Sequence, residues 1–400
     1  MATQTKNNVI DYLNPDFVFI PFREGYKLKV ENDHPVFKEG MLQEGIHSFI
    51  LSSVSGSIMG AKRCIISDGS EVKCIAVANN FKERLGKRQA VKKKKKFSTI
   101  EIISLLKNKN VLSMTHYNKN IWDLIFGATN AKTLIVSSLE LSDELLGNSY
   151  LMSHHQADIL DTIDILIESF GLKHACLALP NTDTKNITTL HEYSGRHPRI
   201  KLKIMNGKYP MGLEHILRRE IWGKSANKKD VLFLSVADCY AIYNALIRNK
   251  HITERLITVS GDMVERPVLI NAKIGSLIEP AIKEFVKLKT NKEENLVFIT
   301  NDPFSGTEVP IESLIVTHDL RGVIITGKKN IKSKKCINCG RCRDGCPEGI
   351  NPKFIMDNFE NPEKLNESKM ENCIKCGLCT YNCPSKINLK PFLIKRFKNE

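Results

Sequence analysis

The sequence predicts a multidomain α+β protein with a strand-rich N-terminal region, an α/β layer in the middle and a small helical, cysteine-rich region at the end. Three observations predict this. Short apolar runs cut by glycines fill the first 80 residues, strands alternate with helices from residue 132 onward, and eight of the twelve cysteines follow residue 335. A chain of 400 residues is long enough to bury several hydrophobic cores.

The composition is that of an ordinary globular protein, with 42% hydrophobic and 26% charged residues. It excludes a disordered tail, a collagen-like fibre and a disulfide miniprotein. The sequence contains no run of 18 apolar residues, and the polar start M-A-T-Q-T-K-N-N does not resemble a signal peptide. We therefore expect a cytoplasmic protein without a transmembrane segment.

Residues 1–81 are predicted to form an N-terminal domain resembling a β-barrel or sandwich. Its apolar runs include Phe17–Ile20, Phe49–Leu51 and Cys74–Val77, and the small residues Ser52–Gly60 are predicted to form a tight turn between strands.

A basic linker follows over residues 82–97, with nine basic residues against one acid between Lys82 and Lys96. It supplies much of the net charge of +15. A solvated linker is the favoured interpretation, and docking to an acidic partner or an anionic lipid surface is the alternative. Nucleic acid is not predicted as a partner, because no aromatic ladder or reading helix accompanies the lysines.

The stretch from residue 98 to 230 is predicted to be an α/β domain with a parallel sheet. Strands are expected at Lys132–Ser138, His174–Leu179 and Ile200–Met205, and a helix is expected near Lys185–Tyr193. Another helix carries four acidic side chains on one face, which we interpret as solvent-exposed and not as metal ligands: Asp158, Asp161, Asp164 and Glu168. A further segment covers residues 231–290, and a connecting segment covers residues 291–330.

The last region, residues 331–400, contains one cysteine pattern twice. Both copies read C-x2-C-x2-C-x3-C-P, which is the spacing of bacterial ferredoxins with two [4Fe-4S] clusters. In such ferredoxins the fourth cysteine of each motif ligates the other cluster. One cluster is therefore predicted on Cys336, Cys339, Cys342 and Cys383, and the second on Cys373, Cys376, Cys379 and Cys346.

Two other uses of these cysteines fit less well. Structural zinc favours separated C-x2-C pairs, and disulfides are disfavoured without a secretion signal. The spacer from Pro347 to Asn372 has a helical pattern, so we expect a helical ferredoxin-type module. The remaining cysteines are expected to be small core residues: Cys64, Cys74, Cys176 and Cys239.

Four further segments resemble motifs of one family, that of the C subunit of the Rnf (ion-translocating oxidoreductase) complex. S-V-S-G at Ser53–Gly56 is similar to a turn of the family's N-terminal barrel. K-Y-P-M-G-L-E at Lys208–Glu214 is similar to the family's K-Y-P-x-G-x-E. The segment Thr253–Val264 follows the start of the family's β-grasp domain, and N-D-P-F-S-G at Asn301–Gly306 resembles G-G-P-M-M-G.

This resemblance implies a fold for each region and a flavin and NADH site. It implies a Rossmann-like domain like that of the complex I 51-kDa subunit over residues 98–230, and a β-grasp (SLBB-like) domain over residues 231–290. It places Lys208, Glu140 and Glu214 in the flavin and NADH pocket. No catalytic residue is assigned.

The sequence departs from the family where a flavin phosphate is expected to bind. The family's G-G-A-G-F-P-T loop falls at residues 110–122, which contain no glycine. Glycine allows backbone N–H groups to close on a phosphate without a Cβ in the way. The acidic motif E-C-E-P becomes E-L-S-D at Glu140–Asp143, and a later family aspartate aligns with Asn148. FMN is thus expected to be bound weakly or not at all.

The predicted function is that of an iron–sulfur electron-transfer subunit resembling the Rnf C subunit, with a degenerate flavin and NADH site. Its expected partner is a redox protein or a membrane electron-transport complex, which would place it as a peripheral protein on the cytoplasmic face. Three alternatives remain open. They are an NADH-oxidising flavin and iron–sulfur oxidoreductase, a proline-reductase-associated electron carrier, and a non-catalytic redox adaptor.

Overall fold

The computed structural model describes residues 9–32, 34–45, 49–82, 96–128, 130–223, 230–290, 293–328, 332–366 and 368–394. It divides into two compact units, one formed by residues 1–301 and 307–326, the other by residues 302–306 and 327–400. Most of the predicted basic linker, residues 83–95, lies outside the described residues. Among the described residues, no helix is long and apolar enough to span a membrane.

The N-terminal region forms two small antiparallel sheets around a shared apolar core that includes Val18, Leu42 and Val77. One sheet has the order β2-β8-β7-β4 and the other β3-β5-β6. The strands are β2 (Phe17–Pro21), β3 (Lys27–Leu28), β4 (Pro35–Val36), β5 (Met41–Glu44), β6 (Phe49–Leu51), β7 (Gly56–Ile65) and β8 (Glu71–Asn79).

The predicted turn at Ser52–Gly60 is shorter than expected, because β7 already begins at Gly56. A Cβ at Gly56 would lie 1.7 Å from the carbonyl oxygen of Ala78, so only glycine lets the two strands approach there.

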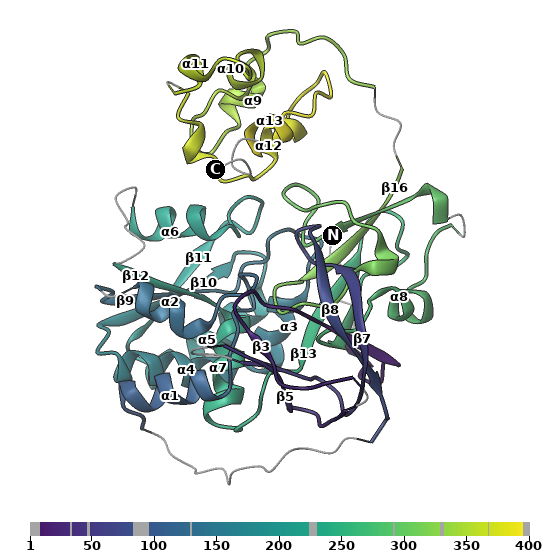
Figure 1. Cartoon of the computed structure of the whole chain (residues 1–400). Helices are drawn as coiled ribbons and strands as arrows, with labels where there is room; N and C mark the ends of the chain where they lie inside the picture. Colours follow the sequence, from purple (N-terminus) through teal and green to yellow (C-terminus); the bar gives the residue numbers. More distant parts are fainter. Residues whose placement is uncertain are drawn as a thin grey trace. The chain divides into compact units, whose positions relative to one another are not determined.

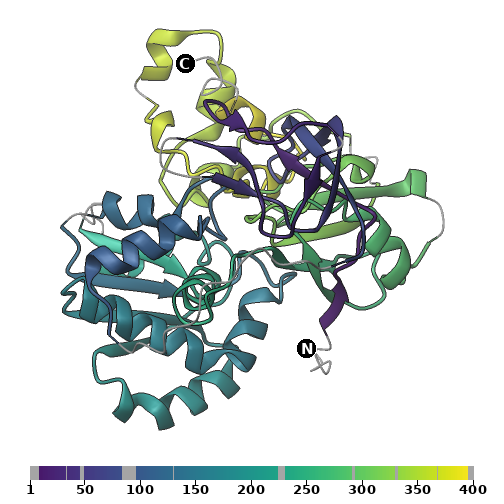
Figure 2. The same ribbon diagram turned by 60° about the horizontal axis from the view of Figure 1, so that its bottom comes forward.

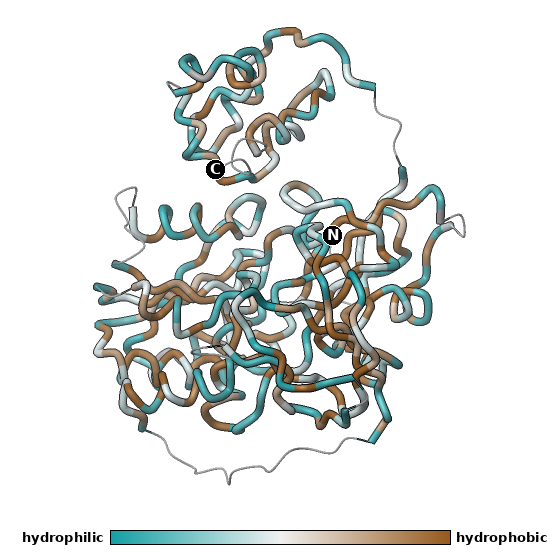
Figure 3. Tube along the Cα trace, in the orientation of Figure 1, coloured by the Kyte–Doolittle hydropathy of each residue, from teal (hydrophilic) through white to brown (hydrophobic). Residues whose placement is uncertain are grey.

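The α/β layer contains a four-stranded parallel sheet of order β11-β10-β9-β12. The strands are β9 (Thr133–Ser137), β10 (His174–Pro180), β11 (Ile200–Met205) and β12 (Val231–Ser235). Much of their length is apolar (Figure 3), as expected for strands covered on both faces.

Helices cover the two faces of this sheet unequally. On one face, buried side chains come from α1 (Thr99–Asn108), α2 (Ile121–Gly127), α3 (Gly147–His154), α4 (Gln156–Ser169), α5 (Thr184–Tyr193) and α7 (Val236–Leu246). The other face packs against α6 (Glu214–Trp222). Figure 1 shows α6 on one side of the strands and α1, α4 and α7 on the other.

This layer extends beyond the predicted boundary at residue 230. Strand β12 pairs in parallel with β9, and α7 packs on α4, so residues 231–246 complete the α/β layer. The expected acidic face of α4 is also partly engaged, because Asp158 pairs with Arg248 at 2.7 Å and Asp164 with His197 at 2.5 Å.

A second large sheet has five strands in the order β1-β14-β13-β16-β15. The strands are β1 (Val9–Tyr12), β13 (Glu254–Ser260), β14 (Val268–Lys273), β15 (Leu296–Thr300) and β16 (Gly322–Gly327), and helix α8 (Glu279–Phe285) contributes to the same core. The expected connecting segment 291–330 thus supplies two strands. The N-terminal strand β1 pairs in parallel with β14 and in Figure 2 runs beside the green strands near the label N.

Short helices form the regular structure of the described residues between 332 and 394 in the second unit. Its helices are α9 (Arg341–Asp344), α10 (Pro352–Asp357), α11 (Pro362–Asn366), α12 (Leu378–Tyr381) and α13 (Lys390–Ile394). The side chain of Asn351 caps α10, which begins at Pro352 within the spacer that was predicted to be helical. Ile350, Ile355 and Leu393 form the core of this unit with the cysteines beside them.

Candidate metal centres and the loop of the α/β layer

The eight cysteines of the second unit gather around two separate cavities. One cavity is lined by Cys336, Cys339, Cys342 and Cys383. The other is lined by Cys346, Cys373, Cys376 and Cys379. In each cavity three cysteines come from one motif and the fourth comes from the other motif, which is the grouping that crossed ligation requires.

The two motifs share one backbone conformation. Asn338 and Lys375 have φ values of 53° and 58°, and Gly340 and Gly377 both have φ of 75°. Each glycine immediately precedes a short helix, α9 or α12. These left-handed residues curl the chain so that the three cysteines of a motif face one cavity.

Several thiols receive backbone N–H groups. The N–H of Asn338 lies 3.4 Å from Sγ of Cys336, and the N–H of Ile387 lies 3.4 Å from Sγ of Cys383. Burial raises the pKa of Cys379 to about 12, so its thiolate needs a compensating cation. Four thiols around one cavity, with N–H donors directed at sulfur, fit a [4Fe-4S] cluster. Within the described ranges, no three His, Cys, Asp or Glu side chains are placed to hold a single metal ion.

Lys390 lines the second cavity together with Cys376 and Cys379. Its ammonium group donates to the carbonyl oxygens of Ser305 at 2.7 Å and Gly306 at 3.1 Å. Burial lowers its pKa. The lysine therefore ties α13 to residues 302–306 of the same unit and places a positive charge beside the thiols of the second cavity.

Replacing Lys390 with methionine is expected to make the reduction potential of the second cluster more negative by several tens of millivolts. Removing a nearby positive charge disfavours the reduced, more negative cluster. A redox titration followed by electron paramagnetic resonance measures the shift. Lys364→Met, at an exposed position of α11, is the control. If the second cluster had the same reduction potential in Lys390→Met and in Lys364→Met, the charge of Lys390 would not have the expected effect.

The loop between α1 and α2 closes onto a buried carboxylate. Asp238, which is 0% exposed, accepts the N–H of Met114 at 2.7 Å and the hydroxyl of Ser113 at 3.1 Å. It also accepts the N–H and hydroxyl of Ser235 at 2.9 and 2.7 Å, which forms a capping box at the start of α7. The N–H and hydroxyl donors of the α1–α2 loop and of the start of α7 are thus already bound to the carboxylate of Asp238.

The structure places the three predicted pocket residues in different environments. Glu140 accepts the N–H groups of Asn148 and Ser149 at 2.5 and 3.3 Å, and burial raises its pKa. Glu214 pairs with His116 at 3.1 Å and with Arg218 at 2.6 Å. No hydrogen bond or ion pair joins either carboxylate to Lys208 among the described residues.

The residues present do not fit the phosphate of a flavin. A phosphate needs free N–H groups in a loop that can approach it closely. Here Met114 N–H is bound to Asp238, and the loop carries side chains at every position from Ser113 to Lys119. The sequence indicated this loss through the missing glycines. It did not identify Asp238, although the S-x-x-D spacing of Ser235 and Asp238 is a capping signal.

Acidification is expected to destabilise the first unit through Glu214. Burial alone would raise the pKa of Glu214, but hydrogen bonds from His116 and Arg218 outweigh it and lower this pKa to about 2. The group therefore contributes stability above its unfolded pKa of about 4.5, and this contribution is lost as the pH falls from about 4.5 to 2.

Thermal unfolding of the wild type and of Glu214→Gln between pH 3 and pH 7 measures this contribution. The destabilisation caused by the substitution should be largest near pH 7 and shrink toward pH 3. Glu220→Gln, on the same helix, is the control. A destabilisation that is constant over this range would exclude the expected role of the Glu214 carboxylate.

Comparison with known proteins identifies two regions. Residues 122–245 match the Nuo51 FMN-binding domain, and residues 327–387 match a 4Fe-4S dicluster domain. The first match begins after the loop 113–119 that closes onto Asp238. The second match contains all eight cysteines of the two cavities.

Several curated relatives carry the same name, that of the C subunit of the ion-translocating oxidoreductase complex. The protein of Buchnera aphidicola is 23% identical over 89% of this chain and 78% of its own length. Those of Edwardsiella ictaluri and Rhodobacter capsulatus are 25% and 26% identical over 57% and 55% of this chain. The matched part spans only 30% and 44% of these two relatives.

A solved structure supports the fold assignment. A chain of an NAD+-reducing [NiFe]-hydrogenase in the air-oxidized state matches with a TM-score of 0.51 and 14% identity, over 75% of this chain and 61% of that chain. The prediction of a mixed α/β protein with a ferredoxin-like C-terminal region is confirmed.

Proposed function

We propose that this chain, a divergent relative of the C subunit of the ion-translocating oxidoreductase complex, is an electron-transfer subunit that passes single electrons through two [4Fe-4S] clusters. The observation that carries the proposal is the grouping of the eight cysteines around two cavities, with one cysteine exchanged between the motifs. We assign Cys336, Cys339, Cys342 and Cys383 to one cluster and Cys346, Cys373, Cys376 and Cys379 to the other.

When bound, the clusters supply one-electron chemistry at potentials that the surrounding protein sets. The chain holds them by thiolates, and backbone N–H groups donate to sulfur. Ile350 and Leu393 line the second cavity and limit access of water there. Cys339 of the first cavity is exposed, so the first cluster is the one that exchanges electrons with a partner.

The partner in this proposal is a redox protein within a membrane electron-transport complex, in line with the name of the relatives. The chain would then act as a peripheral subunit on the cytoplasmic face. Arg341 and Lys386, which line a surface hollow with Cys383, offer positive charge to an acidic partner there.

We infer that the flavin and NADH site of the relatives' FMN-binding domain is degenerate in this chain. Asp238 occupies donors of the loop where the resemblance places a flavin phosphate. Lys208, Glu140 and Glu214 remain the candidates for any residual flavin or NADH contact. In the same proposal the N-terminal sheets correspond to the family's barrel-like domain, and the five-stranded sheet corresponds to its β-grasp domain.

Anaerobic purification followed by iron and flavin counts tests this function. We expect about eight irons per chain and no stoichiometric flavin. Dithionite should bleach the cluster absorbance, and NADH should not. Bound flavin together with bleaching by NADH would favour the alternative of an NADH-oxidising flavoenzyme. A folded, anaerobically reconstituted protein with few irons would contradict the proposal.

A further inference from the structure

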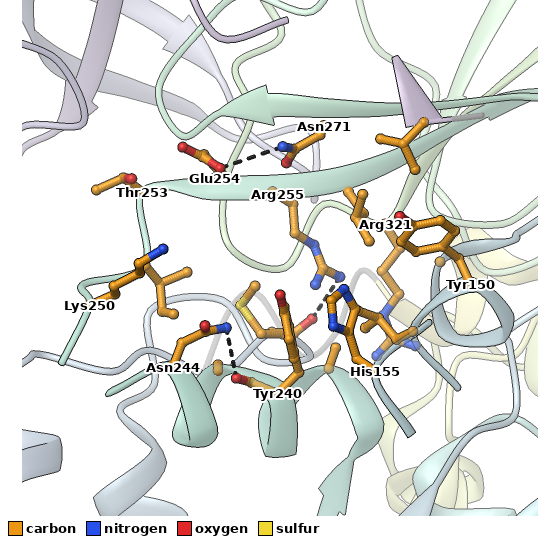
Figure 4. A pocket seen from close by; sticks show the side chains of 18 of the residues that line it. Tyr150, His155, Tyr240, Asn244, Lys250, Thr253, Glu254, Arg255, Asn271 and Arg321 are labelled. Carbon is orange, nitrogen blue, oxygen red and sulfur yellow. Dashed lines mark hydrogen bonds between the residues drawn. The ribbon is translucent and has the colours of Figure 1, made fainter. Parts of the chain in front are cut away.

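Several polar side chains that line a cavity between α7 and β13 are bonded within the fold (Figure 4). The side-chain amide of Asn244 donates to a carbonyl oxygen of its own helix at 3.0 Å, and that of Asn271 donates to the Glu254 carboxylate at 3.4 Å. The Arg255 guanidinium donates to the carbonyl oxygen of Met114 at 3.1 Å. These groups thus stabilise the packing of α7 against β13.

Helix α1, by contrast, exposes apolar side chains to the surface. Ile100 is 80% exposed, although isoleucine is usually a core residue. Ile103 and Lys107 follow it at spacings of three and four residues, so the three side chains lie on the same face of the helix. The residues of α1 that enter the hydrophobic core are Ile102 and Leu106. The core therefore does not account for the exposed isoleucine.

Helix α2 continues this exposed surface. Phe126 is 49% exposed, and its ring meets the half-buried ring of Trp122 edge to face, with 6.1 Å between the ring centroids. The ammonium group of Lys107 lies 4.6 Å from the centroid of the Trp122 ring, which joins α1 to α2 at the outside of the α/β layer (Figure 1). We call this surface the α1–α2 face, and it consists of Ile100, Ile103, Lys107, Trp122 and Phe126.

The chain around the α1–α2 face is basic. Between residues 96 and 132 it has five lysines and two acidic residues. Of the two acids, Glu101 is engaged in the capping box of α1, and Asp123 accepts the side-chain amide of the α2 N-cap residue at 3.2 Å. Lys96, which is exposed and contacts Glu168 at 3.4 Å, is the last of five consecutive lysines that precede α1. The surroundings of the face thus favour a negatively charged binding partner.

We propose that the α1–α2 face docks on an anionic lipid bilayer. Ile100 and Phe126 enter the boundary between the headgroups and the acyl chains, and Lys107 extends its ammonium group to the lipid phosphates. Burial of exposed apolar area and attraction between lysines and anionic lipids both favour this contact. Tryptophan beside lysine is also typical of a membrane interface, which favours a lipid surface over an acidic protein.

The two tryptophans of the chain allow a direct test of this contact. Trp122 belongs to the α1–α2 face, and Trp222 lies at the end of α6. Trp222→Phe leaves Trp122 as the single tryptophan, and Trp122→Phe leaves Trp222. Vesicles of phosphatidylcholine and phosphatidylserine with brominated acyl chains should quench the fluorescence of Trp122 relative to unbrominated vesicles, because bromine quenches tryptophans that lie close to it. Trp222 should be quenched much less.

Co-sedimentation of the full cluster-loaded chain with the same vesicles, unbrominated, measures its affinity. Phe126→Ser should weaken binding about tenfold, because an apolar side chain no longer enters the bilayer. Phe37→Ser is the matched control, since Phe37 is also 49% exposed but lies between β4 and β5. Lys107→Gln should weaken binding at least about threefold, and high salt should weaken it as well. Vesicles of phosphatidylcholine alone should bind at least about tenfold more weakly.

Three results would overturn the proposal. They are the absence of saturable binding to phosphatidylserine vesicles, equal affinity in Phe126→Ser and Phe37→Ser, and quenching of Trp122 no stronger than that of Trp222. Binding without quenching of Trp122 would assign the attraction to the lysines alone. Iron content and cluster absorbance should be the same in all variants. Vesicle binding is thus tested separately from the proposed electron transfer, on which it does not depend.

Discussion

Replacing Cys383 with alanine is expected to remove the cluster of the first motif and to leave the cluster of the second motif in place. Cys383 belongs to the second motif in sequence, but it lines the cavity of Cys336, Cys339 and Cys342. The reciprocal substitution, Cys346→Ala, should remove the cluster held by Cys373, Cys376 and Cys379. Loss of one thiolate leaves a [4Fe-4S] cluster with three protein ligands, which strongly weakens retention.

Iron counts and electron paramagnetic resonance show which cluster is lost in Cys383→Ala and which in Cys346→Ala. Each variant should retain about four of about eight irons, and the remaining signal should differ between them. Cys176→Ala, a change in the core of the α/β layer, is the control and should keep both signals. If Cys383→Ala instead lost the signal attributable to Cys373, Cys376 and Cys379, each motif would hold its own cluster and the crossed assignment would fail.

These cysteines were predictable because their spacing is local. Each motif places four thiols within eleven residues, and the conformation that directs three of them to one cavity is set by nearby left-handed residues such as Gly340 and Gly377. The strands of the parallel sheet were predictable for a related reason. Buried parallel strands such as β9 and β10 are continuous apolar runs bounded by polar residues.

Features that depend on contacts between distant segments were not predictable from one sequence. Strand β1 pairs with β14, more than 250 residues later, and no local pattern encodes that register. The predicted domain boundary at residue 230 lies too early in the chain. An apolar run followed by a helix, as in residues 231–246, fits either neighbouring domain, and only the pairing of β12 with β9 assigns these residues to the α/β layer.

The same distinction between local patterns and distant contacts applies to residues 110–122, where the resemblance places the flavin-phosphate loop. The absence of glycine in residues 110–122 is visible in the sequence, and it predicts a weakened phosphate site. The carboxylate that occupies the donors, Asp238, lies 124 residues after Met114 and is brought there by the sheet. The weakened phosphate site was therefore predictable from the missing glycines, whereas the binding of the loop's donors by the Asp238 carboxylate was not.

The duplicated motif provides a matched pair of glycines for the second large effect. Gly340 and Gly377 occupy equivalent positions and share φ of 75°. A Cβ at Gly340 would have Asp344 Oδ2 as its nearest neighbour, at 3.5 Å, whereas a Cβ at Gly377 would lie 2.2 Å from the carbonyl oxygen of Phe304. Both positions disfavour alanine by backbone strain, and only Gly377 adds a collision with main chain.

Gly377→Ala is thus expected to destabilise the second unit by roughly 1–3 kcal/mol more than Gly340→Ala, which itself should cost about 1–2 kcal/mol. The contact also includes Phe304 and Tyr381, whose rings meet edge to face at 4.9 Å, and Lys390, whose ammonium donates to Ser305. Displacing residues 302–306 removes these contacts together. The rate of cluster bleaching in urea with an iron chelator measures the difference, and it should be faster in Gly377→Ala. Equal rates in the two variants would show that backbone strain alone sets the requirement for glycine, and that residues 302–306 do not stabilise the second cluster.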